Sequence, residues 1–147
     1  MLALAVGYAV YTNGFDASAY FAMLTEACRS NEFREKIWLA SKTASREDLA
    51  ALGNGIAAVD SVPTAIAAVA LTPDSYAETI ANVILLGGDT DTIAAMAGAI
   101  SGALLGIDSI PSILVSQLED SEKGKSYLVE LSDRLFERAS RGNGRAQ

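Results

Sequence analysis

The sequence of 147 residues contains no histidine and only one cysteine, Cys28. Without histidine, the chain cannot carry a Ser-His-Asp triad, a Cys-His pair or a His-based metal site. A single cysteine cannot close an internal disulfide bond, and such a composition is typical of a reducing compartment. Cys28 lies on the apolar side of an expected helix, so we predict a small core residue and not a nucleophile.

Basic residues and long apolar runs are also scarce. The 11 Lys and Arg residues are outnumbered by 18 Asp and Glu, a net charge of −7 that argues against a direct nucleic-acid partner. An apolar run at residues 93–107 is too short to cross a membrane, so no membrane partner is expected. Residues 1–11 resemble the apolar region of a signal peptide, but they lack its basic start and are better explained as a buried helix.

Hydrophobic residues make up 50% of the chain, and Gly and Ala are abundant, which suits closely packed helices. Apolar residues recur at helical spacing and no segment alternates convincingly like a strand, so we predict an all-α protein. Caps, glycine stops and prolines place the expected helices at residues 1–12, 16–29, 31–41, 45–52, 60–71, 72–86, 89–105 and 126–138, with a short helix starting near residue 109.

Some helix starts and buried faces are predicted in detail. Ser45 and Asp48 form the pattern of a capping box. Two other helices are expected to begin at a cap followed by proline in the first turn, one at Asp60 and one at Thr72. Trp38 is expected in the core. Further residues expected on buried faces are Tyr76, Ile80, Val83 and Ile84 in one helix and Leu128, Leu131, Leu135 and Phe136 in the last.

Residues 87–93, Gly-Gly-Asp-Thr-Asp-Thr-Ile, separate two of the expected helices. Glycine accepts positive φ without steric cost, so Gly87 and Gly88 allow the chain to reverse. The following helix should begin at Asp89 or Thr90. Its buried stripe should consist of Ile93, Met96, Ala97, Ile100 and Leu104.

The oxygens of Asp89, Asp91 and Thr92 should then surround the first turn of that helix. Three clustered oxygen ligands suit a hard divalent cation such as Mg²⁺. The same residue types are also ordinary at a helix start, where they cap backbone N–H groups and complement the macrodipole. No Lys or Arg occurs between Arg46 and Lys123 to neutralise the two carboxylates, and this favours a cation.

Three segments are long, ordered and regularly spaced. They are Leu-Gly-Asn-Gly-Ile-Ala-Ala at 52–58, Ser-Val-Pro-Thr-Ala-Ile at 61–66 and Gly-Gly-Asp-Thr-Asp-Thr-Ile-Ala-Ala-Met-Ala-Gly-Ala-Ile-Ser-Gly-Ala at 87–103. Together they resemble the signature of the ADP-ribosylglycohydrolases, most closely the branch that removes ADP-ribose from serine and from poly(ADP-ribose). The resemblance implies an orthogonal helical bundle in which residues 1–140 form the C-terminal half of the family's domain. Residues 141–147 are polar and Gly-rich, and we expect a flexible tail there.

The resemblance also assigns roles to residues. In the family, two Mg²⁺ ions bind the ribose beside the scissile bond and hold the attacking water. By position, Asp89, Asp91 and Thr92 match metal ligands, with Asp91 shared between both ions. Gly55 and Ile56 match a segment that approaches bound ADP-ribose, although Ile56 taken alone would be expected in the core.

The family's other metal ligands, a Thr-Asp-Asp run, lie in its N-terminal half with the catalytic carboxylate and the main diphosphate loop. This sequence contains no Thr-Asp-Asp, so no catalytic residue is expected in it. Mg²⁺ demands near-octahedral coordination, and three ligands from one turn should hold it weakly. We therefore expect the isolated chain to bind Mg²⁺ weakly and not to hydrolyse ADP-ribosyl bonds. The expected partners are ADP-ribose or ADP-ribosylated protein and the missing N-terminal half, in the cytoplasm, nucleus or mitochondrion.

The same residues suggest three other kinds of protein. A strand at residues 83–86 followed by Asp-x-Asp-x-Thr would suggest a haloacid-dehalogenase-type phosphatase, but two glycines intervene and Thr comes one place early. An EF-hand is excluded because Ile93 and Ala94 occupy its fifth and sixth loop positions, where oxygen and glycine are required. A non-catalytic ADP-ribose-binding or structural protein stays open, since some lens crystallins resemble this family and retain its fold.

Overall fold

The structure is a computed structural model that describes residues 1–143. The chain divides into two compact units, Met1–Ile110 and Pro111–Gln147, called here the first and the second unit. Of the predicted flexible tail, residues 144–147 lie outside the described residues. Among residues 1–143, no helix combines the length and the hydrophobicity needed to cross a bilayer.

The described residues contain helices and no strand, which confirms the all-α prediction. The first unit contains α1 (Leu2–Tyr11), α2 (Ala17–Glu26), α3 (Asn31–Ala40), α4 (Arg46–Leu52), α5 (Ala58–Leu71), α6 (Tyr76–Leu86), α7 (Thr90–Leu105) and the 3-10 helix η1 (Ile107–Ser109). The second unit contains α8 (Ser112–Gln117) and α9 (Lys125–Asn143).

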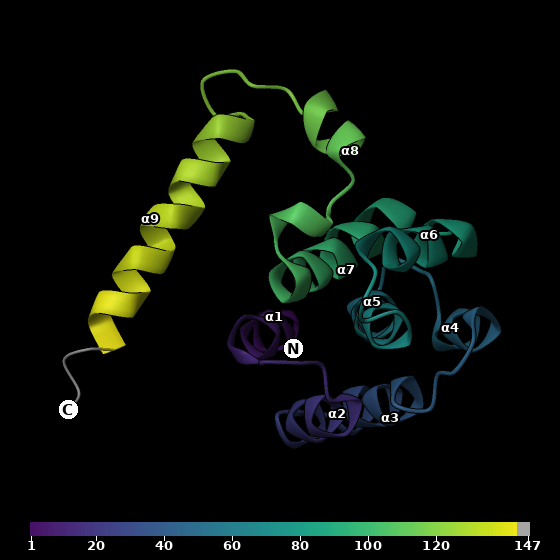
Figure 1. Ribbon diagram of the computed structural model, residues 1–147. Coiled ribbons are helices and arrows are strands. Elements are labelled where there is room, and N and C mark those ends of the chain that lie inside the picture. The colour runs from purple at the N-terminus through teal and green to yellow at the C-terminus, as the bar shows by residue number, and fades with distance from the viewer. Residues whose placement is uncertain (144–147) are drawn as a thin grey trace. The chain divides into compact units, whose positions relative to one another are not determined.

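Helix α5 lies at the centre of the first unit. It contacts α1, α3, α4, α6 and α7, and Figure 1 shows α2 and α3 on one side of it and α6 and α7 on the other. The fully buried residues in the middle of α5 are Ala65, Ile66, Ala67, Ala68 and Val69. Because most of these side chains are small, helices approach α5 closely from opposite sides.

Helix α7 packs against α6, α5 and α1. It buries the predicted stripe: Ile93, Ala97 and Ile100 are fully buried, and Met96 and Leu104 pack against the core. The helix begins at Thr90 and ends before Gly106, which has a φ of +78°. The predicted bounds of this helix are therefore confirmed.

The predicted capping box at the start of α4 is present. Ser45 Oγ accepts a hydrogen bond from the N–H of Asp48, and Asp48 Oδ2 accepts one from the N–H of Ser45 at 3.0 Å. Asp48 Oδ2 also accepts a bond from the N–H of Ala44 at 2.9 Å. One carboxylate therefore holds two backbone donors at the entry of this helix.

Two predicted helix starts are wrong. Helix α5 begins at Ala58 and not at Asp60, because the Asp60 carboxylate binds Lys36 Nζ at 3.0 Å and does not cap the helix. Helix α6 begins after Ser75, whose Oγ accepts a bond from the N–H of Glu78, whereas Thr72 is the last, capping residue of α5. In both cases a tertiary contact or a later serine supersedes the local cap-and-proline pattern.

The prediction of a buried Trp38 is wrong, and that of a buried Cys28 is confirmed. Trp38 is 56% exposed, and Lys42 Nζ lies 5.9 Å from its ring centroid. Cys28 is buried, and its Sγ lies 3.3 Å from the carbonyl oxygen of Leu24.

The buried face of helix α6 is only partly the one predicted: Tyr76 and Ile80 are half-buried and Val83 is fully buried. Ile84 is exposed, while Thr79 and Asn82 are buried beside the predicted Val83. These polar side chains can be buried because they are hydrogen-bonded. The Thr79 and Thr72 hydroxyls lie 2.9 Å apart, and Arg46 Nη2 donates to Asn82 Oδ1 at 3.2 Å. Hydrophobic spacing alone therefore missed these two buried polar residues and wrongly placed Ile84 on the buried face.

In the second unit, α9 is anchored at its first turn by the preceding loop. Asp120 accepts hydrogen bonds from the Oγ and the N–H of Ser126, both at 2.7 Å. These bonds hold the pKa of Asp120 below its ordinary value. The helix extends to Asn143, beyond its predicted end at residue 138.

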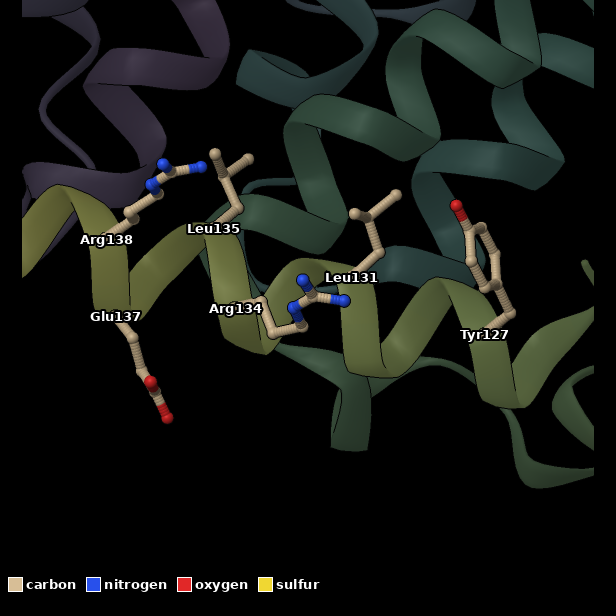
Figure 2. A pocket seen from close by; sticks show the side chains of 6 residues that line it. All are labelled: Tyr127, Leu131, Arg134, Leu135, Glu137 and Arg138. Atoms are coloured by element: carbon tan, nitrogen blue, oxygen red, sulfur yellow. The ribbon is translucent and has the colours of Figure 1, made fainter.

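The predicted buried face of α9 is exposed. Leu128, Leu131, Leu135 and Phe136 are 46–69% exposed, because only the short α8 accompanies α9 among the described residues of this unit. Six α9 side chains line a surface hollow (Figure 2): Tyr127, Leu131, Arg134, Leu135, Glu137 and Arg138. Figure 2 shows Tyr127, Leu131 and Leu135 leaving the helix on one side and Glu137 on the other. A hollow lined by a single helix cannot enclose a ligand.

Candidate metal and ligand site

The turn between α6 and α7, residues 87–92, carries the predicted metal ligands and is called here the aspartate turn. Gly87 and Gly88 have φ angles of +71° and +73°, a conformation that glycine adopts without strain. Asp89 follows as the N-cap residue of α7. The structure therefore brings Asp89, Asp91 and Thr92 together at the first turn of a helix.

The polar groups of the aspartate turn bond mainly to one another. The Asp89 side chain makes no capping bond to the helix backbone, and its Oδ1 accepts a hydrogen bond from Thr92 Oγ1 at 2.9 Å. Asp91 Oδ1 accepts a bond from the N–H of Thr92, also at 2.9 Å. Ordinary capping therefore does not account for Asp89. Its assignment as a metal ligand stays a prediction.

The electrostatics of the turn favour the ionised form of Asp91. The N–H of Thr92 holds the pKa of Asp91 below its ordinary value, and the interaction with the Asp89 carboxyl adds to this effect. Within the described residues, neither carboxylate forms an ion pair. Two carboxylates and a hydroxyl are donor types that Mg²⁺ accepts.

The coordination shell offered by the turn is nevertheless partial. Among residues 1–143, no group of three or more His, Cys, Asp and Glu side chains is placed to hold a metal ion. Mg²⁺ takes about six oxygen ligands, so the turn supplies at most half of them from side chains. The side chains of the turn are of the types that bind Mg²⁺, but they are too few to complete its coordination shell.

The loop before α5, residues 53–57, contacts the aspartate turn and is called here the Asn54 loop. The carbonyl oxygen of Asn54 accepts a hydrogen bond from the N–H of Asp89 at 2.8 Å. The Nδ2 of Asn54 donates to the carbonyl oxygen of Leu86 at 3.1 Å. A Cβ atom at Gly88 would lie only 2.3 Å from the Asn54 carbonyl oxygen. Two motifs that are distant in the sequence are therefore in direct contact.

The Asn54 loop is also held from α3 and α5. Lys36 Nζ donates to the carbonyl oxygen of Leu52 and to Asp60 Oδ1. Thr64 Oγ1 donates to the carbonyl oxygen of Gly53 at 2.6 Å. At Gly53, where φ is +110°, a Cβ atom would lie 2.7 Å from Asp60 Oδ1. The loop is thus anchored on both sides of its tip.

The two predicted ligand-contacting residues, Gly55 and Ile56, lie at that tip. Both are exposed, and Ile56 is 86% exposed, so Ile56 is not a core residue. An exposed apolar side chain on an anchored loop is available to a ligand. The contact with ADP-ribose stays a prediction.

Sequence reasoning placed Asn54 in a motif but did not predict its contacts with Leu86 and Asp89, and it missed the pair of Lys36 and Asp60. Asn54 lies between two glycines, which indicates a turn but does not indicate what the turn contacts. Lys36 pairs with Asp60 across 24 residues, and the sequence near Lys36 carries no sign of this contact.

The fold and the site define a class: an all-helical protein that presents carboxylate and hydroxyl oxygens at a helix start beside an anchored loop. Comparison with known proteins identifies the family. The chain belongs to the ADP-ribosylglycohydrolase family, whose model matches residues 1–144.

The chain is similar to several curated proteins. It is 59% identical over 75 residues to the ADP-ribosylhydrolase ARH3 of Danio rerio, which covers 44% of this chain and 20% of that protein. It is 40% identical over 112 residues to ARH3 of Homo sapiens, covering 69% and 31%. It is 35% identical over 143 residues to an uncharacterized protein of Archaeoglobus fulgidus, covering 92% and 44%. The chain therefore spans less than half the length of these relatives.

Proposed function

We propose that this chain is the C-terminal, metal-ligating half of an ADP-ribosyl glycohydrolase that removes ADP-ribose from modified protein side chains or from poly(ADP-ribose). The observation that carries the proposal is the contact between the aspartate turn, where Thr92 Oγ1 and Asp89 Oδ1 lie 2.9 Å apart, and the loop that exposes Ile56. The names of the ARH3 relatives support the same activity. An intracellular location, in cytoplasm, nucleus or mitochondrion, belongs to this proposal.

Asp89, Asp91 and Thr92 would hold Mg²⁺, two ions in the complete site, with Asp91 shared between them. When bound, the ions supply Lewis acidity and a polarised water beside the ribose. The chain's own groups orient the ligands: the Thr92 hydroxyl fixes one oxygen of Asp89, and the Thr92 N–H favours the ionised form of Asp91. Gly55 leaves room for a ligand to approach the backbone, and Ile56 offers it an apolar surface.

We also propose that the isolated chain binds Mg²⁺ weakly and does not hydrolyse ADP-ribosyl bonds. Three side-chain ligands from one turn leave about half of an octahedral shell to water or to other protein groups. The remaining ligands and the carboxylate used in catalysis would come from an N-terminal half. That half and ADP-ribosylated protein are the proposed partners.

Titration calorimetry with Mg²⁺ tests the metal assignment. The wild-type chain should bind weakly, and Asp91→Asn should bind about tenfold or more weakly still, because a charged ligand is lost while the side-chain size is kept. Asp74→Asn removes an exposed carboxylate outside the turn and is the matched control. Equal Mg²⁺ binding by Asp91→Asn and the wild type would contradict the metal assignment.

Two assays test the proposed activity and the need for an N-terminal half: binding of ADP-ribose, and its release from a serine-ADP-ribosylated peptide. The chain alone should release no ADP-ribose, and a separately produced N-terminal half from an ARH3 relative should restore release. Tight, Asp91-dependent Mg²⁺ binding with turnover by the chain alone would refute the proposed inactivity. Binding of ADP-ribose without release in either preparation would favour a non-catalytic binding protein.

A further inference from the structure

One residue, Asn54, bonds to the ends of two helices at once. Leu86 is the last residue of α6, and its carbonyl group is one of those that lack a partner within a helix. Asn54 Nδ2 supplies that partner at 3.1 Å. Asp89 is the N-cap residue of α7, and its N–H donates to the Asn54 carbonyl oxygen at 2.8 Å. Asn54 therefore joins the end of one helix to the start of the next.

The space around Asn54 leaves little freedom for this contact. A Cβ atom at Gly88 would lie 2.7 Å from Asn54 Cγ as well as 2.3 Å from its carbonyl oxygen. On the other side, the Thr64 hydroxyl holds the carbonyl group of Gly53 at 2.6 Å. The backbone of Asn54 is thus fixed by α5. Its main-chain carbonyl group passes that constraint to Asp89, and its side chain passes it to Leu86, just before the aspartate turn.

We propose that Asn54 is a positioning residue that couples the aspartate turn to the loop carrying Gly55 and Ile56. The side-chain amide of Asn54 fixes the chain at Leu86, where α6 ends, and the main-chain carbonyl group of Asn54 fixes the backbone of Asp89. The direction of the Asp89 carboxylate therefore depends on Asn54. The relevance of this coupling to a metal site rests on the proposed function. The coupling itself is a property of the metal-free chain.

The variant Asn54→Asp tests the coupling because it keeps the size of the side chain and removes its N–H donor. A residue that only fills space would tolerate this change. Asn13→Asp adds the same charge at an exposed position in the α1–α2 connection and is the matched control. Asn54→Ser removes the bond to Leu86 without adding charge and serves if Asn54→Asp does not fold.

The first measurement is amide hydrogen exchange of the metal-free protein. The N–H of Asp89 should lose protection about tenfold in Asn54→Asp and Asn54→Ser. Both variants keep the main-chain carbonyl group that accepts from Asp89, but they lose the side-chain bond to Leu86 that holds the two segments together. The amides in the buried middle of α5 should keep theirs. Unchanged exchange at Asp89 in both variants would overturn the inference, whether or not the chain binds metal.

The second measurement uses Tb³⁺ as a probe and its luminescence lifetime in H₂O and D₂O as a count of coordinated waters. Asn54→Asp and Asn54→Ser should show more coordinated water than the wild type and Asn13→Asp, because the Asp89 carboxylate is no longer held in one orientation. A carboxylate added by Asn54→Asp would by itself attract the cation and displace water, so a higher water count cannot be a charge effect. Equal water counts in wild type and variants would count against the inference.

The two proposals fail separately. If the wild-type chain binds neither Mg²⁺ nor Tb³⁺, the proposed function fails, and exchange at Asp89 alone decides the role of Asn54. If the wild type binds both ions and Asn54→Asp changes neither the exchange nor the water count, the coupling fails and the metal assignment stands.

Discussion

Single residues determine whether the aspartate turn can form at all. Gly87 and Gly88 have nearly the same positive φ, yet their surroundings differ. A Cβ atom at Gly87 would meet nothing within 4 Å, whereas one at Gly88 would collide with the carbonyl oxygen of Asn54. The two glycines thus separate the effect of backbone conformation from that of close contact.

Replacing each glycine by alanine should show this difference. Gly87→Ala should lower the free energy of unfolding by about 1–3 kcal/mol, the cost of a side chain at positive φ. Gly88→Ala should lower it by about 1 kcal/mol or more beyond that, because the Asn54 loop must also move. Urea denaturation of both variants measures the two losses. Equal losses would show that the contact with Asn54 does not constrain the turn.

At this scale the sequence predicts the site only in part. Asp89, Asp91 and Thr92 are close in the sequence, so a helix start was enough to bring them together. The bond between Asn54 and Asp89 joins separate segments, and no local pattern around either residue specifies it. The exposure of Ile56 was likewise decided by how the loop is anchored and not by its hydrophobicity.

At the scale of helices, capping by side chains explains where several elements begin. The capping box of α4 was predictable because both partners lie within four residues. The starts of α5 and α6 were not, because Asp60 turns to Lys36 of α3 and Thr72 completes the preceding helix. The burial of Thr79 and Asn82 in α6 was also not predicted, because their hydrogen-bond partners lie in other segments.

The cap of α4 should make its first turn sensitive to acid. Hydrogen bonds from the N–H of Ala44 and from Ser45 lower the pKa of Asp48 below its ordinary value of 3.8. Because the folded-state pKa is the lower one, the cap stabilises the helix above pH 3.8, and this contribution is lost as the pH falls through the folded-state pKa.

NMR titration of the backbone amides of Ala44 and Ser45 measures this loss. Both resonances should shift together at a pH below 3.8 in the wild type. In Asp48→Asn the side chain still accepts hydrogen bonds and no longer titrates, so the shifts should disappear. Amides that titrate equally in wild type and Asp48→Asn would show that another group controls them.

At the scale of the molecule, the hydrophobic core belongs to one unit. The buried hydrophobic residues of the described chain all lie between Ala5 and Ile100, within the unit Met1–Ile110. The apolar side chains of α9 are exposed, although their spacing is that of a buried helix face. Helical periodicity predicted the helix correctly and could not indicate whether a partner covers it.

Expressed separately, the two units should behave differently. Residues 1–110 should unfold cooperatively on heating, with a midpoint within about 5 °C of that of the whole chain, because they retain its core. Residues 111–147 should show no cooperative transition, since the described side chains of this unit include no buried apolar one. Circular dichroism during heating measures both. Loss of cooperative unfolding in residues 1–110 would contradict this division of stability.

The bond between Asn54 and Asp89 also has a kinetic consequence. Helices can form from local interactions soon after refolding begins, whereas this bond must wait until α4, α5, α6 and α7 have assembled. Recovery of helical ellipticity in a stopped-flow experiment should therefore precede recovery of exchange protection at the N–H of Asp89, measured by quenched-flow labelling. The delay between the two signals would report the last stage of assembly of this chain.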